Sequence, residues 1–141
     1  MKKYKVGYTT GVYDMFHIGH LNILRKAKEQ CDFLIVGVST DELVQKEKNK
    51  TPIIPFEERV EILEAIRYVD KVVPQVNKDK IKAWETHQFD VMFVGDDWKN
   101  SKIFSEAEKI LNTHGVEVVY FPYTKHISST KLREKISNKE W

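Results

Sequence analysis

Cysteine, long apolar runs and an excess of charge of one sign are all scarce in this sequence. The 141 residues include one cysteine, Cys31, which excludes an internal disulfide and is interpreted as a buried thiol. No apolar run approaches the roughly 20 residues that a membrane-spanning helix needs. The first residues lead straight into an expected strand, without a signal-peptide pattern. We therefore expect a cytoplasmic protein without a membrane span.

The charge balance argues against nucleic acid as a partner. Lysine and arginine number 23 and aspartate and glutamate 21, a formal net charge of +2. Proteins that bind nucleic acid through its phosphates usually carry a much larger basic excess. A chain of 141 residues is long enough for one core and too short for two. We expect one domain over residues 1–141 and no nucleic-acid partner.

Short apolar runs alternate with segments of helical periodicity along the chain. Strands are predicted over residues 5–9, 33–39, 71–73, 91–94 and 116–121. Helices are predicted over residues 18–30, from 40 or 41, from 55, over 79–87 and 101–112, and after 128. This alternation favours right-handed βαβ crossovers and an α/β three-layer sandwich with a five-stranded parallel sheet. Ligands of such sheets bind beyond the carboxyl ends of the strands.

The stretch GVYDMFHIGH, residues 11–20, lies where the first strand should give way to the first helix. His17 and His20 are three residues apart, so both rings lie on one side of the first helical turn. Gly19 between them would admit a ligand close to the backbone. A helix N-terminus offers unpaired N–H groups to an anion, and two imidazoles add donors. The stretch predicts a polyphosphate site; a metal pair or two surface histidines are the alternatives.

Four blocks in order carry a resemblance to a known family: GVYDMFHIGH, then RYVD at 67–70, GDDW at 95–98 and ISSTK at 127–131. Together they resemble the cytidylyltransferase branch of the HxGH nucleotidyltransferases, which have a Rossmann-like fold. Within that branch the blocks are most similar to the bacterial enzymes that act on glycerol 3-phosphate. The resemblance implies transfer of CMP from CTP to a small phosphorylated alcohol, first of all glycerol 3-phosphate, with Mg²⁺ as cofactor. It also implies a homodimer.

The resemblance assigns the transfer chemistry to two pairs of residues. His17 and His20 are expected to stabilise the five-coordinate transition state at the α-phosphate. Lys48 and Lys50 are expected to reach the site from a polar loop, although a solvated run of lysines is the alternative. Transfer of this kind needs positive groups and in-line geometry more than covalent chemistry from the protein.

The expected nucleotide-binding residues fall in the same blocks and in the helix that follows Pro55. They are Thr10, Gly11, Val12, Tyr13, Asp14, Gly19, Arg59, Arg67, Gly95, Asp96, Asp97, Ile127, Ser128, Ser129 and Thr130.

Several of these residues have a structural alternative. Asp14 is either a turn residue or an acid with a Mg²⁺-linked role, with Mg²⁺ held mainly by the nucleotide phosphates. Arg59 and Arg67 are interpreted as phosphate-binding guanidinium groups that face a cleft, with ion pairs to Glu64 or Asp70 as the alternative. The RYVD block of the family also lies near the subunit interface.

The two remaining blocks have alternatives of the same kind. Asp96 and Asp97 are expected to accept ribose hydroxyls or the cytosine amino group, or else form a solvated turn. The hydroxyl groups of Ser128, Ser129 and Thr130 suit a terminal phosphate and also suit a plain N-cap.

The sequence departs from the family at three places. Relatives commonly carry Arg-Thr-Glu-Gly where this chain has YTKH at 123–126, so a phosphate-binding arginine is missing and a flexible glycine has become His126. The third departure is Val12, which replaces a small hydroxyl residue. Lys125 is predicted to supply the missing charge, unless Arg59 or the lysine loop already does. The departures leave two alternatives open: another nucleotide or acceptor, as in an adenylyltransferase or a phosphoethanolamine or sugar-phosphate enzyme, or a nucleotide-binding module without turnover.

Overall fold

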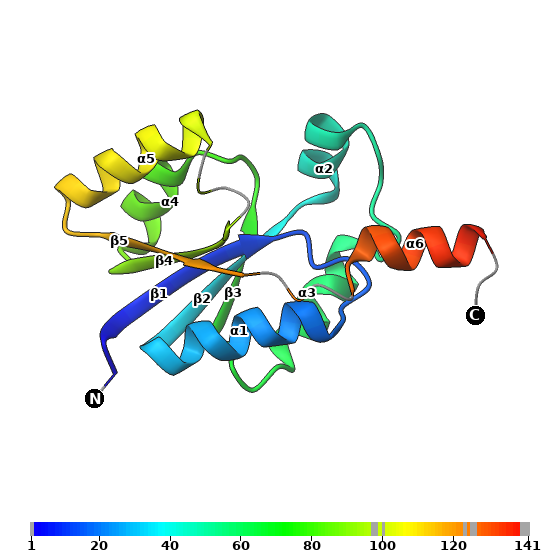
Figure 1. Cartoon of the computed structure of the whole chain (residues 1–141), viewed down its shortest axis with the longest axis horizontal. Helices are drawn as coiled ribbons and strands as arrows, with labels where there is room; N and C mark the ends of the chain where they lie inside the picture. The colour runs from blue at the N-terminus through cyan, green and yellow to red at the C-terminus, as the bar shows by residue number, and fades with distance from the viewer. Residues whose placement is uncertain (1, 97–98, 100, 123, 125–126, 139–141) are drawn as a thin grey trace.

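The computed structural model describes residues 2–96, 99, 101–122, 124 and 127–138 (Figure 1). The strands are β1 (Tyr4–Gly11), β2 (Cys31–Ser39), β3 (Lys71–Gln75), β4 (Val91–Gly95) and β5 (Glu117–Phe121). The helices are α1 (Ile18–Gln30), α2 (Asp41–Lys48), α3 (Phe56–Glu64), α4 (Lys80–His87), α5 (Lys102–Thr113) and α6 (Ser129–Ser137). The predicted alternation of strands and helices is confirmed, with strand ends shifted by a few residues.

All five strands pair in parallel in the order β3-β2-β1-β4-β5. The chain moves outward from β1 to β3 and then returns to the other side of β1 with β4. The strand order therefore reverses between β1 and β4, and a crevice at the carboxyl ends of these two strands is the usual ligand site of such sheets. Gly11 and Gly95 end the two strands at this point.

Helices cover both faces of the sheet, as the prediction of a three-layer sandwich requires. Figure 1 shows α1 and α3 on one face and α4 and α5 on the other. Because successive strand residues point to opposite faces, Leu34 and Val36 of β2 join one buried cluster while Ile35 between them joins the other. The same alternation separates Phe93 from Met92 in β4. A strand covered on both faces must be apolar throughout, which explains the continuous run that predicted β2.

Side chains mark where most helices begin. The hydroxyl oxygens of Thr40, Ser101 and Ser128 accept backbone N–H groups of the first turns of α2, α5 and α6, and the Asp79 carboxylate does so for α4. Pro55, predicted in the first turn of α3, lies one position earlier at its N-cap. Among the described residues, no helix has the length and apolar character needed to cross a membrane.

Candidate active site

A strained loop joins β1 to α1 at the crevice. Tyr13 and Met15 have positive φ angles of 56° and 49°, in the left-handed region that side chains with a Cβ rarely adopt. The Tyr13 ring is buried and lies over Gly11, where an added Cβ would come within 3.0 Å of it. Gly11 therefore makes room for the Tyr13 ring. Packing of this ring stabilises positive φ angles that would be unfavourable in an isolated loop. The loop ends at His17, which is the N-cap residue of α1.

The two histidines cap α1 reciprocally. The His17 Nδ1 accepts the N–H of Gly19 at 3.1 Å, and the His17 N–H donates to the Nδ1 of His20 at 3.2 Å. Serine or threonine with glutamate or glutamine usually forms such a capping box. The imidazoles also stack with their centroids 3.8 Å apart. Because each Nδ1 is an acceptor, a neutral ring carries its proton on Nε2.

Both imidazoles are held in the neutral form. Burial lowers the pKa of His20 to about 3, helped by the neighbouring His17 and opposed by Asp14. Burial also lowers the pKa of His17. The His17 Nε2 is buried and has no hydrogen-bond partner among the described residues. A buried donor without an acceptor is costly, so this N–H is positioned for an oxygen atom of a ligand.

Gly19 has a different role from the one that the sequence suggested. A Cβ at Gly19 would lie 2.9 Å from Cε1 of the His17 ring and 3.7 Å from Cγ2 of Ile127. The missing side chain therefore makes room first for the His17 imidazole. The expectation that Gly19 chiefly admits a ligand is corrected accordingly.

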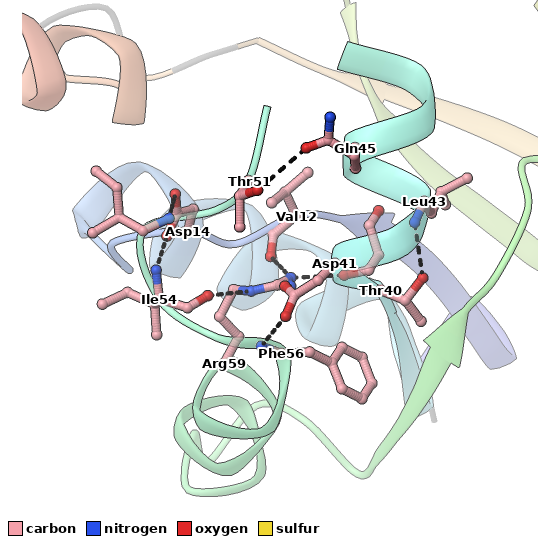
Figure 2. Close-up of polar contacts among 12 residues, drawn as sticks. Val12, Asp14, Thr40, Asp41, Leu43, Gln45, Thr51, Ile54, Phe56 and Arg59 are labelled. Carbon is pink, nitrogen blue, oxygen red and sulfur yellow. Dashed lines mark hydrogen bonds and ion pairs between the residues drawn. The ribbon is translucent and has the colours of Figure 1, made fainter. Parts of the chain in front are cut away.

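Asp14 connects three segments of the site. Its buried carboxylate accepts the N–H groups of Ile53 and Ile54, both at 2.9 Å (Figure 2 labels Asp14 and Ile54). Its backbone carbonyl accepts the hydroxyl of Ser129 at 2.6 Å, and Arg133 Nη2 lies 3.8 Å from the carboxylate. Asp14 thus fixes the segment after α2 and the start of α6 against the histidine loop. Both carboxylate oxygens already accept backbone N–H groups, which argues against a primary role in binding Mg²⁺.

Arg59 does not face the cleft, and this expectation is wrong. The residue is 1% exposed, and its guanidinium donates to the carbonyl oxygens of Ile54, Val12 and Ser39, while Nη2 pairs with Asp41 (Figure 2). A buried guanidinium is stable only when its N–H groups are paired. Arg59 therefore ties the ends of β1 and β2 to the start of α3. The carboxylate partner is also neither of the two that the sequence suggested.

Arg67 lies at the opposite edge of the sheet. It precedes β3, whose first residue Lys71 pairs with Ile35 near the middle of β2. The N–H of Asp70 donates to Leu34, and its carboxylate pairs with Lys28. Since the strands are parallel, residues that precede them lie at their amino ends, whereas the histidines lie at the carboxyl ends. Arg67 and the histidines of the same chain therefore lie at opposite ends of the strands, and the expectation that they share one site is wrong.

The lysine loop does lie on the histidine side of the sheet. α2 ends at Lys48, and Asn49 follows in a left-handed conformation. Lys48 and Lys50 are exposed. Partial desolvation of its ammonium group lowers the pKa of Lys48, and the charges of Lys78, Lys50 and Arg133 lower it further. The sequence analysis missed Lys78 and Arg133, because only tertiary structure brings them near Lys48.

The carboxyl-terminal block packs against the histidine loop, as its position in the expected site requires. The hydroxyl of Ser128 accepts the N–H of Lys131 at 3.1 Å, and Thr130 is exposed in the first turn of α6. Arg133 follows Ser129 by four residues, and its Nη1 is buried without a hydrogen-bond partner among the described residues. This one-turn spacing, which places both residues on one helix face, was the signal in the sequence that could have found Arg133.

The β4 side of the crevice is described in part. Thr10 lies near the end of β1 opposite Gly37, and Gly95 ends β4 opposite Phe121. Asp96 is exposed, and its carbonyl accepts the N–H of Lys99. Thr124 accepts a hydrogen bond from Asn22 of α1 at 3.0 Å. Predictions for Asp97, Trp98, Tyr123, Lys125 and His126 lie outside the described residues.

In parallel sheets of this kind, ligands bind at the point where the strand order reverses. A helix N-terminus at that point, here capped by two histidines, is typical of proteins that bind nucleotide phosphates. The chain matches the Cytidylyltransferase-like family over residues 8–135 and belongs to that family, as a nucleotidyltransferase. This confirms the family and the enzyme class that the four blocks predicted.

Individual relatives are similar along most of the chain. Glycerol-3-phosphate cytidylyltransferase of Bacillus subtilis (strain 168) is 40% identical over 130 residues, which are 92% of this chain and 95% of that protein. FAD synthase of Thermococcus kodakarensis is 38% identical over 122 residues, 80% of this chain and 76% of that protein. A lipopolysaccharide core biosynthesis protein of Thermoplasma volcanium shares the fold, with a TM-score of 0.70, 23% identity, and 88% of this chain and 99% of that one covered.

Proposed function

We propose that this protein transfers CMP from CTP to glycerol 3-phosphate and releases pyrophosphate. The observation that carries the proposal is the 40% identity to the Bacillus subtilis glycerol-3-phosphate cytidylyltransferase over nearly the whole length of both chains. The site geometry agrees with it, because a histidine-capped helix N-terminus meets the carboxyl ends of β1 and β4.

The histidines act as neutral donors in this proposal. An oxygen of the acceptor's phosphate attacks the α-phosphorus in line, and the bond to the bridging oxygen of pyrophosphate breaks. Negative charge grows on the oxygens around the α-phosphorus, and in this proposal the Nε2–H groups of His17 and His20 donate to these oxygens. Preorganised donors of this kind stabilise the transition state more than the ground state. Lys48 and Arg133, whose charges act on each other, add positive charge on the same side of the sheet.

Mg²⁺ enters the proposal with the nucleotide. The described residues contain no group of three or more histidine, cysteine, aspartate or glutamate side chains that could hold a metal ion. Asp14, the one acid at the loop, is occupied by backbone N–H groups. We infer that the phosphates of CTP hold Mg²⁺, which neutralises part of their charge when bound.

ATP is the alternative nucleotide, favoured by the 38% identity to the FAD synthase of Thermococcus kodakarensis. Pyrophosphate release is to be measured with CTP and ATP against glycerol 3-phosphate, phosphoethanolamine, a sugar phosphate and FMN. Turnover that requires CTP and glycerol 3-phosphate is the expected result. Turnover with ATP and FMN would replace the proposal by the alternative, and binding without turnover would make the chain a nucleotide-binding module.

The single domain and the homodimer stay predictions. The homodimer is inferred from the resemblance alone, and the exposed Arg67 and Asp70 belong to the block that lies near the interface in the family. Light scattering at micromolar concentration should give twice the mass of one chain; the mass of one chain would contradict the homodimer.

A further inference from the structure

The connection between β5 and α6 passes the carboxyl ends of the central strands. β5 lies beside β4 on the side away from β1, whereas Thr124, soon after β5 ends, bonds to α1, the helix that follows β1. Further along, Cγ2 of Ile127 lies 3.7 Å from the position that a Cβ of Gly19 would take. The connection therefore passes the crevice of β4 and β1, where the nucleotide is expected, and packs on the first turns of α1 (Figure 1).

Asn22 joins α1 to this connection. Its Nδ2 donates to the hydroxyl oxygen of Thr124 at 3.0 Å, and its Oδ1 accepts a hydrogen bond from Nη2 of Arg25 at 3.3 Å. Arg25 follows Asn22 by three residues, so the two side chains share one face of α1. All three side chains are half-buried. Both ends of the Asn22 amide are thus engaged.

The Arg25 guanidinium determines which way the Asn22 amide points. A guanidinium has donors only, so the amide atom that faces it is the oxygen. The amide nitrogen then faces Thr124 and can only donate, so the Thr124 hydroxyl accepts this bond and keeps its own proton for another partner. Within the part of the chain that the structure describes, no side chain or backbone group accepts that proton.

The three side chains form a chain of hydrogen bonds with one direction, which begins at a positive charge. Each bond polarises the next, so a hydroxyl at the end of such a chain is a stronger donor than an isolated hydroxyl. An anionic oxygen is the acceptor that suits it best, because hydrogen bonds to charged acceptors are the stronger ones. The phosphates of a nucleotide in the neighbouring crevice carry such oxygens.

We propose that Asn22 and Arg25 are positioning residues for the nucleotide: they fix the connection against α1 and orient the Thr124 hydroxyl to donate to an anionic oxygen of the nucleotide. This inference rests on the proposed function, which supplies the nucleotide. No covalent bond to the protein forms, and no proton is transferred. Asn22 and Arg25 lie outside the four sequence blocks, so no pattern in the sequence pointed to them.

A double-mutant cycle on CTP binding, measured by calorimetry with Mg²⁺, tests the proposal. Thr124→Val removes the hydroxyl and should raise the dissociation constant for CTP on the order of tenfold, the loss of one hydrogen bond to a charged group. Asn22→Ala should raise it severalfold, and Thr124→Ser, which keeps the hydroxyl, should not. The double variant Asn22→Ala/Thr124→Val should bind CTP as Thr124→Val does, because Asn22 acts through the hydroxyl. Effects that multiply, or normal binding by Thr124→Val, overturn the proposal.

Asn22→Asp tests the direction of the hydrogen bond. An ionised carboxylate only accepts, so the Thr124 hydroxyl would donate its proton to it and lose that proton for the nucleotide. CTP binding should weaken more than in Asn112→Asp, the matched change at an exposed position of α5. An equal loss when Asn22→Asp is made in the Thr124→Val background would be charge repulsion alone and would overturn the orientation. Arg25→Ala frees the amide to turn over and should weaken CTP binding only while Thr124 is present.

Parallel titrations with ATP separate this inference from the proposed function. Coupling between Asn22 and Thr124 that is seen with ATP alone would keep the positioning role and reject transfer from CTP. Normal CTP affinity in every variant, in a protein that releases pyrophosphate from CTP and glycerol 3-phosphate, would keep the proposed function and reject the positioning role.

Discussion

At the residue scale, His20 has a structural role and a proposed catalytic role, and one substitution alone would not separate their effects. Its Nδ1 caps α1 by accepting the N–H of His17, while its Nε2 carries the proton of the neutral ring. Removing the side chain therefore weakens the helix N-terminus as well as the transition state. Glutamine at the same position can still accept the cap hydrogen bond, since glutamine is a usual residue at this position of a capping box.

We predict that His20→Ala and His20→Gln both lower kcat by on the order of a hundredfold or more, the usual effect of losing one preorganised donor. KM for CTP should change little, because the donor matters most as charge develops in the transition state. Only His20→Ala should also lose about 1 kcal/mol of unfolding free energy through the lost cap. A His20→Gln enzyme with normal kcat and weaker CTP binding would contradict the catalytic role.

At the element scale, Arg59 joins elements that the sequence places far apart. Its guanidinium binds carbonyl oxygens at the ends of β1 and β2, a carbonyl before α3, and the Asp41 side chain in the first turn of α2. The carboxylate of Asp41 also accepts the N–H of Phe56 at the start of α3. These contacts hold the carboxyl edge of the sheet together beneath the histidine loop.

Arg59→Lys is expected to lower the unfolding free energy by about 3 kcal/mol, because one ammonium group cannot replace the planar set of donors and leaves buried acceptors unpaired. Denaturant titration followed by circular dichroism measures this loss. Arg67→Lys, an identical change at an exposed position, should alter stability by less than about 0.5 kcal/mol. If Arg59→Lys kept its stability and instead raised KM for CTP, Arg59 would be a ligand-binding residue after all.

At the scale of the whole molecule, patterns within the sequence predicted the elements well, because apolar runs and N-cap residues act locally. The nine residues of β2 follow from a continuous apolar run and the thirteen residues of α1 from helical periodicity, and Thr40 and Ser128 cap the helices that follow them. The family blocks likewise predicted a nucleotidyltransferase.

The sequence could not predict which way a long side chain points or what lies beside it. Arg59 was assigned to the cleft because its charge suits phosphate, yet helix packing turns it inward. Arg67 was assigned to the histidine side, although the register of β3 places it at the amino edge. Lys78 and Arg133 were missed, because only the folded chain brings them near Lys48.

The neutral histidine pair should make the stability of the whole molecule depend on pH. The pKa of His20 is about 3 in the folded chain and about 6.5 in the unfolded chain. As pH falls below about 6.5, the unfolded chain binds a proton that the folded chain does not bind, so the unfolding free energy decreases. For this one proton the unfolding free energy changes by up to ~1.4 kcal/mol per pH unit. The lowered pKa of His17 acts in the same direction. Above pH 6.5 this contribution is constant.

Denaturant titrations at pH 5, 6 and 7 should show this loss, with His20→Gln as the comparison. Glutamine does not titrate, so the variant should lose less unfolding free energy between pH 7 and pH 5 than the unchanged protein. The other ionisable groups are common to both proteins, and the difference between the two curves isolates His20. Parallel curves would mean that His20 keeps an ordinary pKa in the folded chain, and the histidine pair would then carry positive charge at mildly acidic pH rather than act as two neutral donors.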